Sequence, residues 1–412
     1  MGSGSWGREG AYRAVNAVKC GAGNNKVWGV SFNQLDYGYR NWAAAVAGNL
    51  IIVLDVLEDT QIAVLDIYRD DDKDEEFFCV CWASNEDGEP LVCAAGANGV
   101  IRVVNVLSGD VYKTLVGHGG SVNDLRVHPR NRFWLLSGAK DESVRMWNLK
   151  SGVMIAIFGG DEGHRGDVLS VDFHVKLPEH DPQTGEELPV RPIIVSCGMD
   201  KTVRIWQFPE HLLPRVHEAQ DWHLSPSKFK TINVKYTVSK ERTLHTEFVD
   251  CVRWVGNLVM SKAGNGDEET ARQERSTLPP NKILLWDPLE LEEADTLGSR
   301  PREDSESKNP FDSAEIKRKT NVISEYEIPR SHHWFNKFST DFCQRLVACG
   351  NDYGEVFVYD IHAYPPCRVA KCYNQSREAQ SQCRQVALSY DGSTILSCHD
   401  NGQIWRWDKN ER

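Results

Sequence analysis

The sequence predicts an all-β fold, a closed ring of seven four-stranded sheets called a β-propeller. Three segments share one pattern, in which an apolar run, a small polar residue and a turn lead into a second strand that contains Trp: 135–149, 194–208 and 395–409. Four looser copies bring the set to seven: 43–56, 92–106, 281–288 and 346–361. The 42 positions from Asn105 to Trp147 match the roughly 40–45-residue period of a propeller blade.

Two of the units carry the marks of a WD repeat, because Gly117-His118 and Gly163-His164 lie upstream of them. In such a unit Asp in the tight turn orients His, His reaches Ser, and Ser reaches the indole N–H. Two networks are predicted: His118, Ser137, Asp141 and Trp147, and His164, Ser196, Asp200 and Trp206. Because buried polar groups persist only when they are paired, we assign these histidines structural rather than catalytic roles.

The repeat organises the chain as one domain over residues 21–412, after a flexible tail or leader over 1–20. The first unit begins near Val27 and the last ends at Trp407, so we expect the terminal strands to complete one another's blade. Four insertions interrupt the period and are expected to form surface loops: about 177–192, 209–247, 264–281 and 289–325.

Composition excludes several classes of protein. The formal net charge of -12 argues against general nucleic-acid binding and suits a basic partner. No run of about eighteen apolar residues exists, so no membrane span is predicted. The twelve cysteines include no CxxC pair, which favours small buried side chains over a zinc site. GxSxG, HExxH and P-loop motifs are missing, so we expect neither an enzyme nor a cofactor.

Several longer strings are more specific than the repeat itself. They are VGHGGSVNDLRVHPR at 116–130, AIFGGDEGHRGDVLSVDF at 156–173, SCGMDKTVRIW at 196–206, FVDCVRWVGNLVMSK at 248–262 and IWRWD at 404–408. From about Val27 to Asp408 the chain resembles the EED / extra sex combs family, as a divergent member. The resemblance implies a nuclear, non-catalytic WD-repeat scaffold of Polycomb repressive complex two. Its implied partners are an Enhancer-of-zeste-type SET-domain methyltransferase, a Suppressor-of-zeste-type subunit and a trimethylated histone three tail.

The resemblance also implies an aromatic cage that binds trimethyl-lysine and stimulates the methyltransferase. By local alignment the cage includes Phe77, from EEFFCVCW at 75–82, and Trp334 and Phe335, from HHWFNKFSTDF at 332–342. Leu115 stands where the family has Tyr, and Lys337, a candidate peptide contact, stands where Arg is usual. Ring faces attract a trimethylammonium group by roughly 0.5–2 kcal/mol per good contact.

Four points stay open at this level. The acidic residues at 70–76 either steer a basic tail or form a solvated loop. The missing ring at Leu115 leaves an alternative, a scaffold of the same complex that no longer reads methyl-lysine. A WD-repeat substrate adaptor of a ubiquitin ligase is a more distant alternative that rests on the fold alone. Lys317-Arg318-Lys319 is either a nuclear import signal or an ordinary solvated run.

Overall fold

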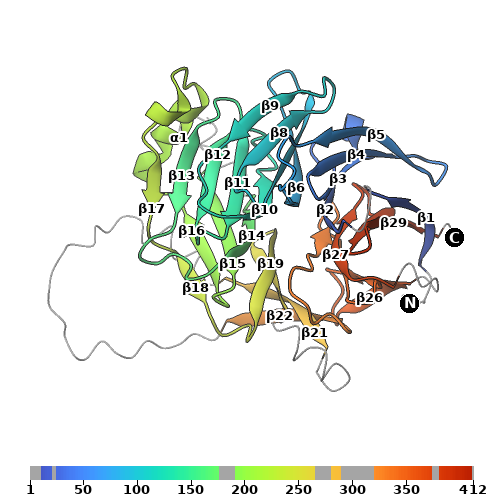
Figure 1. Ribbon diagram of the computed structural model, residues 1–412. Coiled ribbons are helices and arrows are strands. Elements are labelled where there is room, and N and C mark those ends of the chain that lie inside the picture. Colours follow the sequence, from blue (N-terminus) through green and yellow to red (C-terminus); the bar gives the residue numbers. More distant parts are fainter. Residues whose placement is uncertain are drawn as a thin grey trace, which may run out of the picture.

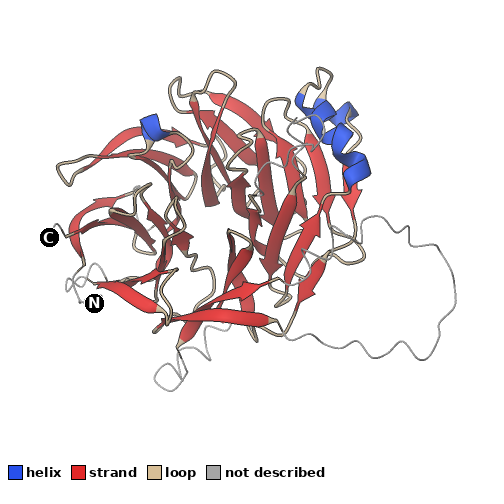
Figure 2. Cartoon of the chain, turned by 180° about the vertical axis from the view of Figure 1, so that it is seen from behind, coloured by secondary structure: helices blue, strands red, loops and turns tan. Residues whose placement is uncertain are grey.

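A computed structural model shows the predicted ring of seven sheets (Figures 1 and 2). The structure describes residues 11–20, 25–175, 191–264, 280–288, 320–373 and 380–410. Within these ranges six sheets have four strands and one has five. Six of the seven repeat units fall on the second and third strands of their blades, and 281–288 falls on the third strand of the fifth, so the seven-bladed fold class is confirmed.

The blades follow one another along the chain. The first has β2 (Val27–Phe32), β3 (Trp42–Ala47), β4 (Leu50–Val56) and β5 (Ile62–Arg69); the second has β6 (Phe77–Ser84), β7 (Pro90–Gly96), β8 (Ile101–Asn105) and β9 (Val111–Leu115). The third has β10 (Val122–Val127), β11 (Trp134–Ala139), β12 (Val144–Asn148), β13 (Met154–Phe158) and β17 (Ile232–Val234). The fourth has β14 (Val168–Phe173), β15 (Ile193–Gly198), β16 (Val203–Gln207) and β18 (Ser239–Glu241).

The remaining three blades close the ring. The fifth has β19 (Phe248–Val255), β20 (Leu258–Gly264), β21 (Asn281–Asp287) and β22 (Asn321–Ile328). The sixth has β23 (Ser339–Thr340), β24 (Leu346–Gly350), β25 (Val356–Asp360) and β26 (Cys367–Cys372). The seventh has β27 (Cys383–Leu388), β28 (Thr394–His399), β29 (Gln403–Lys409) and, on its outside, β1 (Tyr12–Lys19).

The seventh blade joins the two ends of the chain. β1 pairs antiparallel with β29 from Tyr12 opposite Lys409 to Lys19 opposite Gln403, and Figure 1 shows both ends on one side of the ring. The terminal strands therefore complete one blade, as expected. The expectation of a flexible tail over 1–20 is wrong for 12–19, because these residues cover the edge of β29. Tyr12 is buried, and its hydroxyl donates to the carbonyl of Gly392 at 2.5 Å.

The insertion at 209–247 is also more ordered than a surface loop. It contains α1 (Leu213–Gln220), the 3-10 turns η2 (Glu210–Leu212) and η3 (Pro226–Lys228), and the strands β17 and β18. β17 pairs parallel with β13, and β18 pairs antiparallel with β16. The segment folds because its apolar side chains, among them Val216, Phe229 and Ile232, join the buried cluster between the third and fourth blades.

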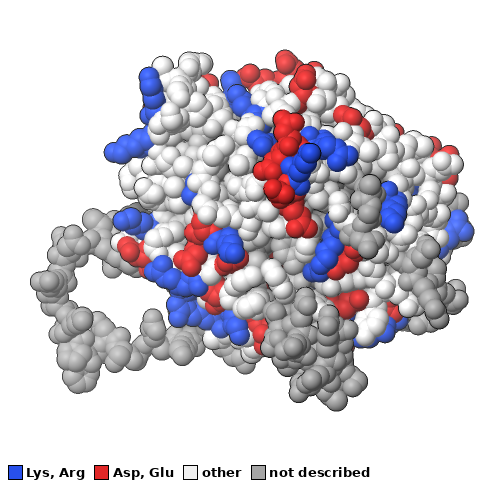
Figure 3. All heavy atoms as spheres, in the orientation of Figure 1, with Lys and Arg blue, Asp and Glu red and all other residues white. Residues whose placement is uncertain are grey.

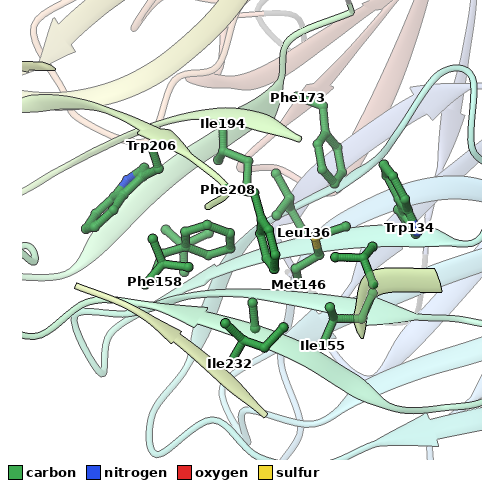
Figure 4. Close-up of a cluster of buried hydrophobic side chains, with 14 of the residues drawn as sticks. Trp134, Leu136, Met146, Ile155, Phe158, Phe173, Ile194, Trp206, Phe208 and Ile232 are labelled. Carbon is green, nitrogen blue, oxygen red and sulfur yellow. The ribbon is translucent and has the colours of Figure 1, made fainter. Parts of the chain in front are cut away.

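That cluster is typical of the inter-blade cores. Figure 4 shows Trp134, Leu136 and Met146 of the third blade facing Phe173, Ile194 and Trp206 of the fourth. Phe158 lies edge-on to Trp206, with ring centroids 5.9 Å apart. Such large apolar side chains stabilise the fold by about 1.5–3 kcal/mol each when fully buried.

Both predicted His–Ser–Trp networks are present. His118 Nδ1 lies 2.9 Å from Asp141 and its Nε2 lies 2.6 Å from Ser137 Oγ, which accepts the indole N–H of Trp147 at 2.8 Å. The second network repeats this arrangement: His164 contacts Asp200 at 3.0 Å and Ser196 at 2.8 Å, and Trp206 donates to Ser196 at 2.8 Å. Burial lowers the pKa of both histidines, which suits neutral structural groups.

Two further networks were not predicted. Trp286 donates to Ser261, which also contacts His245, and Trp407 donates to Ser397, which contacts His399. In both, the His does not follow Gly as it does in the two predicted networks.

The other insertions lie mostly outside the described residues. This applies to 177–192, 264–281 and 289–325, although β22 begins at Asn321 and so takes in the end of the last one. Lys317-Arg318-Lys319 also lies outside them. Ten of the twelve cysteines are buried, and Cys343 is the exposed one. In the part of the chain that the structure describes, no helix is long and apolar enough to cross a membrane, and no three metal-binding side chains gather.

Candidate functional site

The first strand of each blade lines the central channel. β2, β6, β10, β14 and β19 contact one another in order, and β27 contacts both β2 and β23. Because the inner strands of a propeller all run in the same direction along its axis, their first residues lie at one mouth and their last residues at the other. We call these the first mouth and the second mouth.

Four aromatic side chains meet at the first mouth. The Phe335 ring lies 5.3 Å from Trp28, 5.7 Å from Trp334 and 6.3 Å from Phe78, and Trp28 and Phe78 lie 5.5 Å apart. All four contacts are edge-to-face, which is a favourable geometry for aromatic rings. We call Trp28, Phe78, Trp334 and Phe335 the ring cluster. Phe335 is buried at its centre, and the other three rings are partly exposed.

A turn in the backbone allows the adjacent Trp334 and Phe335 to serve one site. Phe335 has φ 60°, a left-handed conformation that is rare for a bulky side chain. The chain here is not an extended strand, so the alternation of side chains between two faces does not apply. Asn336 fixes the turn: its N–H donates to Asp250 at 3.1 Å and its side chain donates to the Gly350 carbonyl at 2.8 Å.

The other two predicted cage positions are buried in walls between blades. Phe77 has no exposed surface and packs with Ala44, Val46 and Val80 between the first and second blades. The ring contacts found among the described residues include none between Phe77 and Trp334 or Phe335. Leu115 is 2 % exposed in the core between the second and third blades. A ligand would contact either side chain only after local rearrangement.

Lys337 does not point outward toward a peptide. Its ammonium group is buried in the channel, 2.5 Å from the Asn123 carbonyl and 3.1 Å from the Asp124 carboxylate. The same nitrogen lies 4.9 Å from the centre of the Phe335 ring. The expectation of a peptide contact at Lys337 is therefore wrong for this conformation, because the carboxylate of the third blade draws the side chain inward.

The protein already places its own cations on the ring cluster. The Arg384 guanidinium lies 4.7 Å from the centre of the Trp28 ring and is held there by Asp400, at 2.6 and 2.8 Å. Lys26 lies 5.1 Å from the same ring. The indole N–H of Trp28 donates to Glu76 at 2.7 Å. Two of the protein's own cations therefore lie at the Trp28 ring, and part of its face is occupied.

The acidic segment at 70–76 divides into two groups. Asp70 and Glu75 are buried, and Asp70 pairs with Arg102 at 2.6 Å. Burial alone would raise the pKa of Asp70, but the Arg102 hydrogen bond holds it below its usual value. Asp71, Asp72 and Asp74 are exposed and lie within a few residues of Phe78. On the face that Figure 3 shows, acidic and basic side chains lie side by side.

Sequence reasoning missed Trp28 and Phe78. Phe78 lies directly after the predicted Phe77, and Trp28 lies in the first blade, for which the sequence predicts no cage residue. An aromatic residue one position after the start of an inner strand is the signal that both share: Trp28 in β2 and Phe78 in β6.

The chain is similar to several known proteins. The family model "WD domain, G-beta repeat" matches residues 109–148 and 155–207. "Polycomb group protein FIE1" of Oryza sativa subsp. japonica is 38% identical over 98% of this chain and 93% of its own length. "Polycomb protein esc" of Drosophila melanogaster is 31% identical over 97% of this chain and 85% of its own. In the Chaetomium thermophilum structure of polycomb repressive complex 2, one chain matches with TM-score 0.69 and 18% identity, covering 96% of this chain and 97% of that one.

Proposed function

The chain belongs to the Polycomb FIE/esc family of WD-repeat proteins, and from this premise we propose that it is a scaffold subunit of a nuclear histone methyltransferase complex of the Polycomb type. Family membership agrees with the expectation that it is not an enzyme. A closed seven-bladed ring supports the scaffold role, since its two mouths and its rim offer separate binding surfaces. The expected partners remain an Enhancer-of-zeste-type SET-domain methyltransferase and a Suppressor-of-zeste-type subunit.

The proposal extends to reading of a trimethylated histone three tail at the first mouth, with stimulation of the methyltransferase. One observation carries it: three partly exposed rings, Trp28, Phe78 and Trp334, surround the buried Phe335. Ring faces attract a quaternary ammonium group, and the rings also cover its apolar methyl groups. The two internal cations at Trp28 support the same preference.

Calorimetry with a trimethyl-lysine histone three peptide and its unmodified counterpart tests the reader role. We expect weak binding that depends on methylation and is lost in Trp334→Ala with the fold intact, because Trp334 is partly exposed. Trp222→Ala is the matched control, since Trp222 is a partly exposed indole that packs on Phe229 away from the channel. Equal affinity for the two peptides would overturn the reader role.

A scaffold that has lost methyl-lysine reading is the second candidate. Two observations favour it: Leu115 contributes no ring, and Arg384 covers part of Trp28. In that case the protein still co-purifies with a SET-domain methyltransferase while neither peptide binds. Co-purification with ubiquitin-ligase components in place of the methyltransferase would instead favour the adaptor alternative, which rests on the fold alone.

A further inference from the structure

Glu76 contacts the ring cluster directly. One of its carboxylate oxygens accepts the indole N–H of Trp28 at 2.7 Å. Trp28 is in β2 of the first blade, whereas Glu76 immediately precedes β6 of the second blade, so this hydrogen bond crosses from one blade to the next. Phe78, whose ring lies 5.5 Å from that of Trp28, follows Glu76 by two residues. The carboxylate therefore fixes the Trp28 ring relative to Phe78.

The backbone that carries Glu76 is itself held tightly. Its carbonyl accepts the N–H of Ala97 at 3.0 Å, and the N–H of Phe77 donates to the carbonyl of Gly48 at 2.9 Å. Gly96 packs so closely on this segment that a Cβ there would lie 1.8 Å from the Glu76 carbonyl oxygen. Because such a close approach requires glycine, the segment has little freedom to move. The Glu76 side chain thus reaches Trp28 from a fixed position.

Two cations already lie against the Trp28 ring, and they share one carboxylate. Arg384 and Lys26 lie 4.7 and 5.1 Å from the ring centre, and they contact Asp400 at 2.6 and 3.5 Å. Glu76 is a second carboxylate in contact with this ring, through the indole N–H. The two carboxylates together balance the two cations. Without Glu76 the ring would lie beside one uncompensated positive charge, which opposes the approach of a further cation.

We propose that Glu76 is a positioning and specificity residue of the first mouth, which holds the Trp28 ring in place and makes the ring cluster prefer a cation to a neutral group of the same shape. Two effects act together. The held ring keeps its place beside Phe78 and Phe335, and the carboxylate offsets the protein's own cations, so that the ring faces still attract a positive charge. This inference rests on the proposed reader function, and it specifies a ligand that is recognised by its charge as well as by its methyl groups.

Calorimetry with two histone three peptides of the same sequence tests this role. One carries trimethyl-lysine, and the other carries its neutral isostere, in which carbon replaces the ammonium nitrogen. The ratio of the two affinities measures recognition of the charge, and we expect the unaltered protein to bind the charged peptide more tightly. Glu76→Gln retains an oxygen that can accept the indole N–H but loses the negative charge. It should therefore weaken binding of the charged peptide about threefold and leave binding of the neutral peptide unchanged.

Two further variants complete the test. Glu76→Ala also removes the acceptor, so both peptides should bind more weakly because the Trp28 ring is no longer held. Glu89→Gln is the matched control. Glu89 is a partly exposed glutamate at the opposite end of the second blade, where it accepts hydrogen bonds from Asn85 and Asn105 at 2.7 Å. Loss of its charge should leave both affinities unchanged.

The outcomes separate the role of Glu76 from the reader function itself. If the unaltered protein does not distinguish the trimethylated peptide from the unmodified one, the reader function fails and the role of Glu76 fails with it. If binding depends on methylation but Glu76→Gln binds both test peptides as Glu89→Gln does, only the role of Glu76 is overturned. Equal weakening of the charged and the neutral peptide in Glu76→Gln would indicate a purely structural effect and would also overturn that role.

Discussion

The two mouths of the channel are built from the same inner strands but have opposite chemistry. At the first mouth, aromatic rings gather and the protein supplies cations to them, Arg384 at Trp28 and Lys337 at Phe335. At the second mouth, the cations Arg126 and Arg253 line a cavity. The same inner strands therefore begin beside aromatic rings and end beside arginines.

Buried ion pairs in the middle of the channel connect the two mouths. Lys337 reaches from the ring-cluster segment to Asp124, which also contacts Arg253 of the second mouth. Asp250 binds Lys262 and accepts the N–H of Asn336, directly after Phe335. A substitution at either mouth therefore has a structural route to the other, and the predictions below separate local from shared effects.

The largest expected effect distinguishes Phe77, in the wall between the first and second blades, from Phe78 in the ring cluster. Phe77→Ala should lower the free energy of unfolding by about 3–5 kcal/mol, because it empties a fully buried site. Peptide binding by the protein that remains folded should persist. Phe78→Ala should cost less stability and should weaken trimethyl-lysine binding. Urea unfolding and calorimetry measure the two quantities. A stable Phe77→Ala variant that no longer binds the peptide would contradict this prediction, because it would mean that Phe77 contributes to the cage.

The next effect concerns the second mouth and depends on pH. The pKa of Asp172 is raised to about 7 by burial, opposed by Arg126 and by the N–H of Trp254 and assisted by Asp124. A carboxyl whose pKa is higher in the folded state binds more protons there than in the unfolded state, so stability falls as pH rises from about 4 to about 7.

Asp172→Asn should remove this fall and should increase stability at pH 8. We expect a gain of about 1–2 kcal/mol, since Asp172 is only partly buried. Urea unfolding between pH 5 and pH 8, at about unit intervals, measures it. A variant with the same pH slope as the unaltered protein would show that Asp172 is not the responsible group.

A smaller effect sharpens the comparison at the first mouth. Arg384→Gln frees the face of Trp28 and should tighten trimethyl-lysine binding by about two- to fivefold, the equivalent of about 0.5–1 kcal/mol for one cation–π contact. Arg406→Gln is the control, because Arg406 is similarly buried and paired with Asp408 but lies in a different part of the seventh blade. Weaker binding in Arg384→Gln would mean that Arg384 organises the ring cluster instead of competing for it.

The smallest effect concerns steering. Replacing exposed Asp71 and Asp74 together by Asn should slow association of a basic peptide about twofold at low ionic strength, with no change in stability. At about 1 M salt the difference should vanish, because the Debye length falls to about 3 Å. Stopped-flow association rates measure this; a difference that survives high salt would indicate direct contact.

Much of the fold was predictable because the repeat encodes its own hydrogen-bond networks. Ser137 and Trp147, or Ser196 and Trp206, lie ten residues apart on paired strands, so the sequence alone indicates the blade. The structure of 209–247 was not predictable. β17 belongs to the third blade, whereas β16 before it and β18 after it belong to the fourth, and its parallel pairing with β13 has no local signal in the sequence.

The site was predictable only where neighbours in sequence are neighbours in space. Trp334 and Phe335 satisfy that condition, and Trp28 joins them from more than 300 residues away. The choice between Phe77 and Phe78 depends on a register shift between Phe77 and Cys79 in β6, which changes the ring that faces the channel. Arg126 and Arg253 are likewise far apart in the sequence, and both lie close to Asp124 in the structure.

The pairing of β1 with β29 has a consequence for how the protein is made. β1 is synthesised long before β29, the strand that it covers. Until β29 has been synthesised, β1 has no partner strand and its edge remains unpaired. The seventh blade therefore forms only after β29 has emerged, and a nascent chain stalled before Gln403 has an open ring.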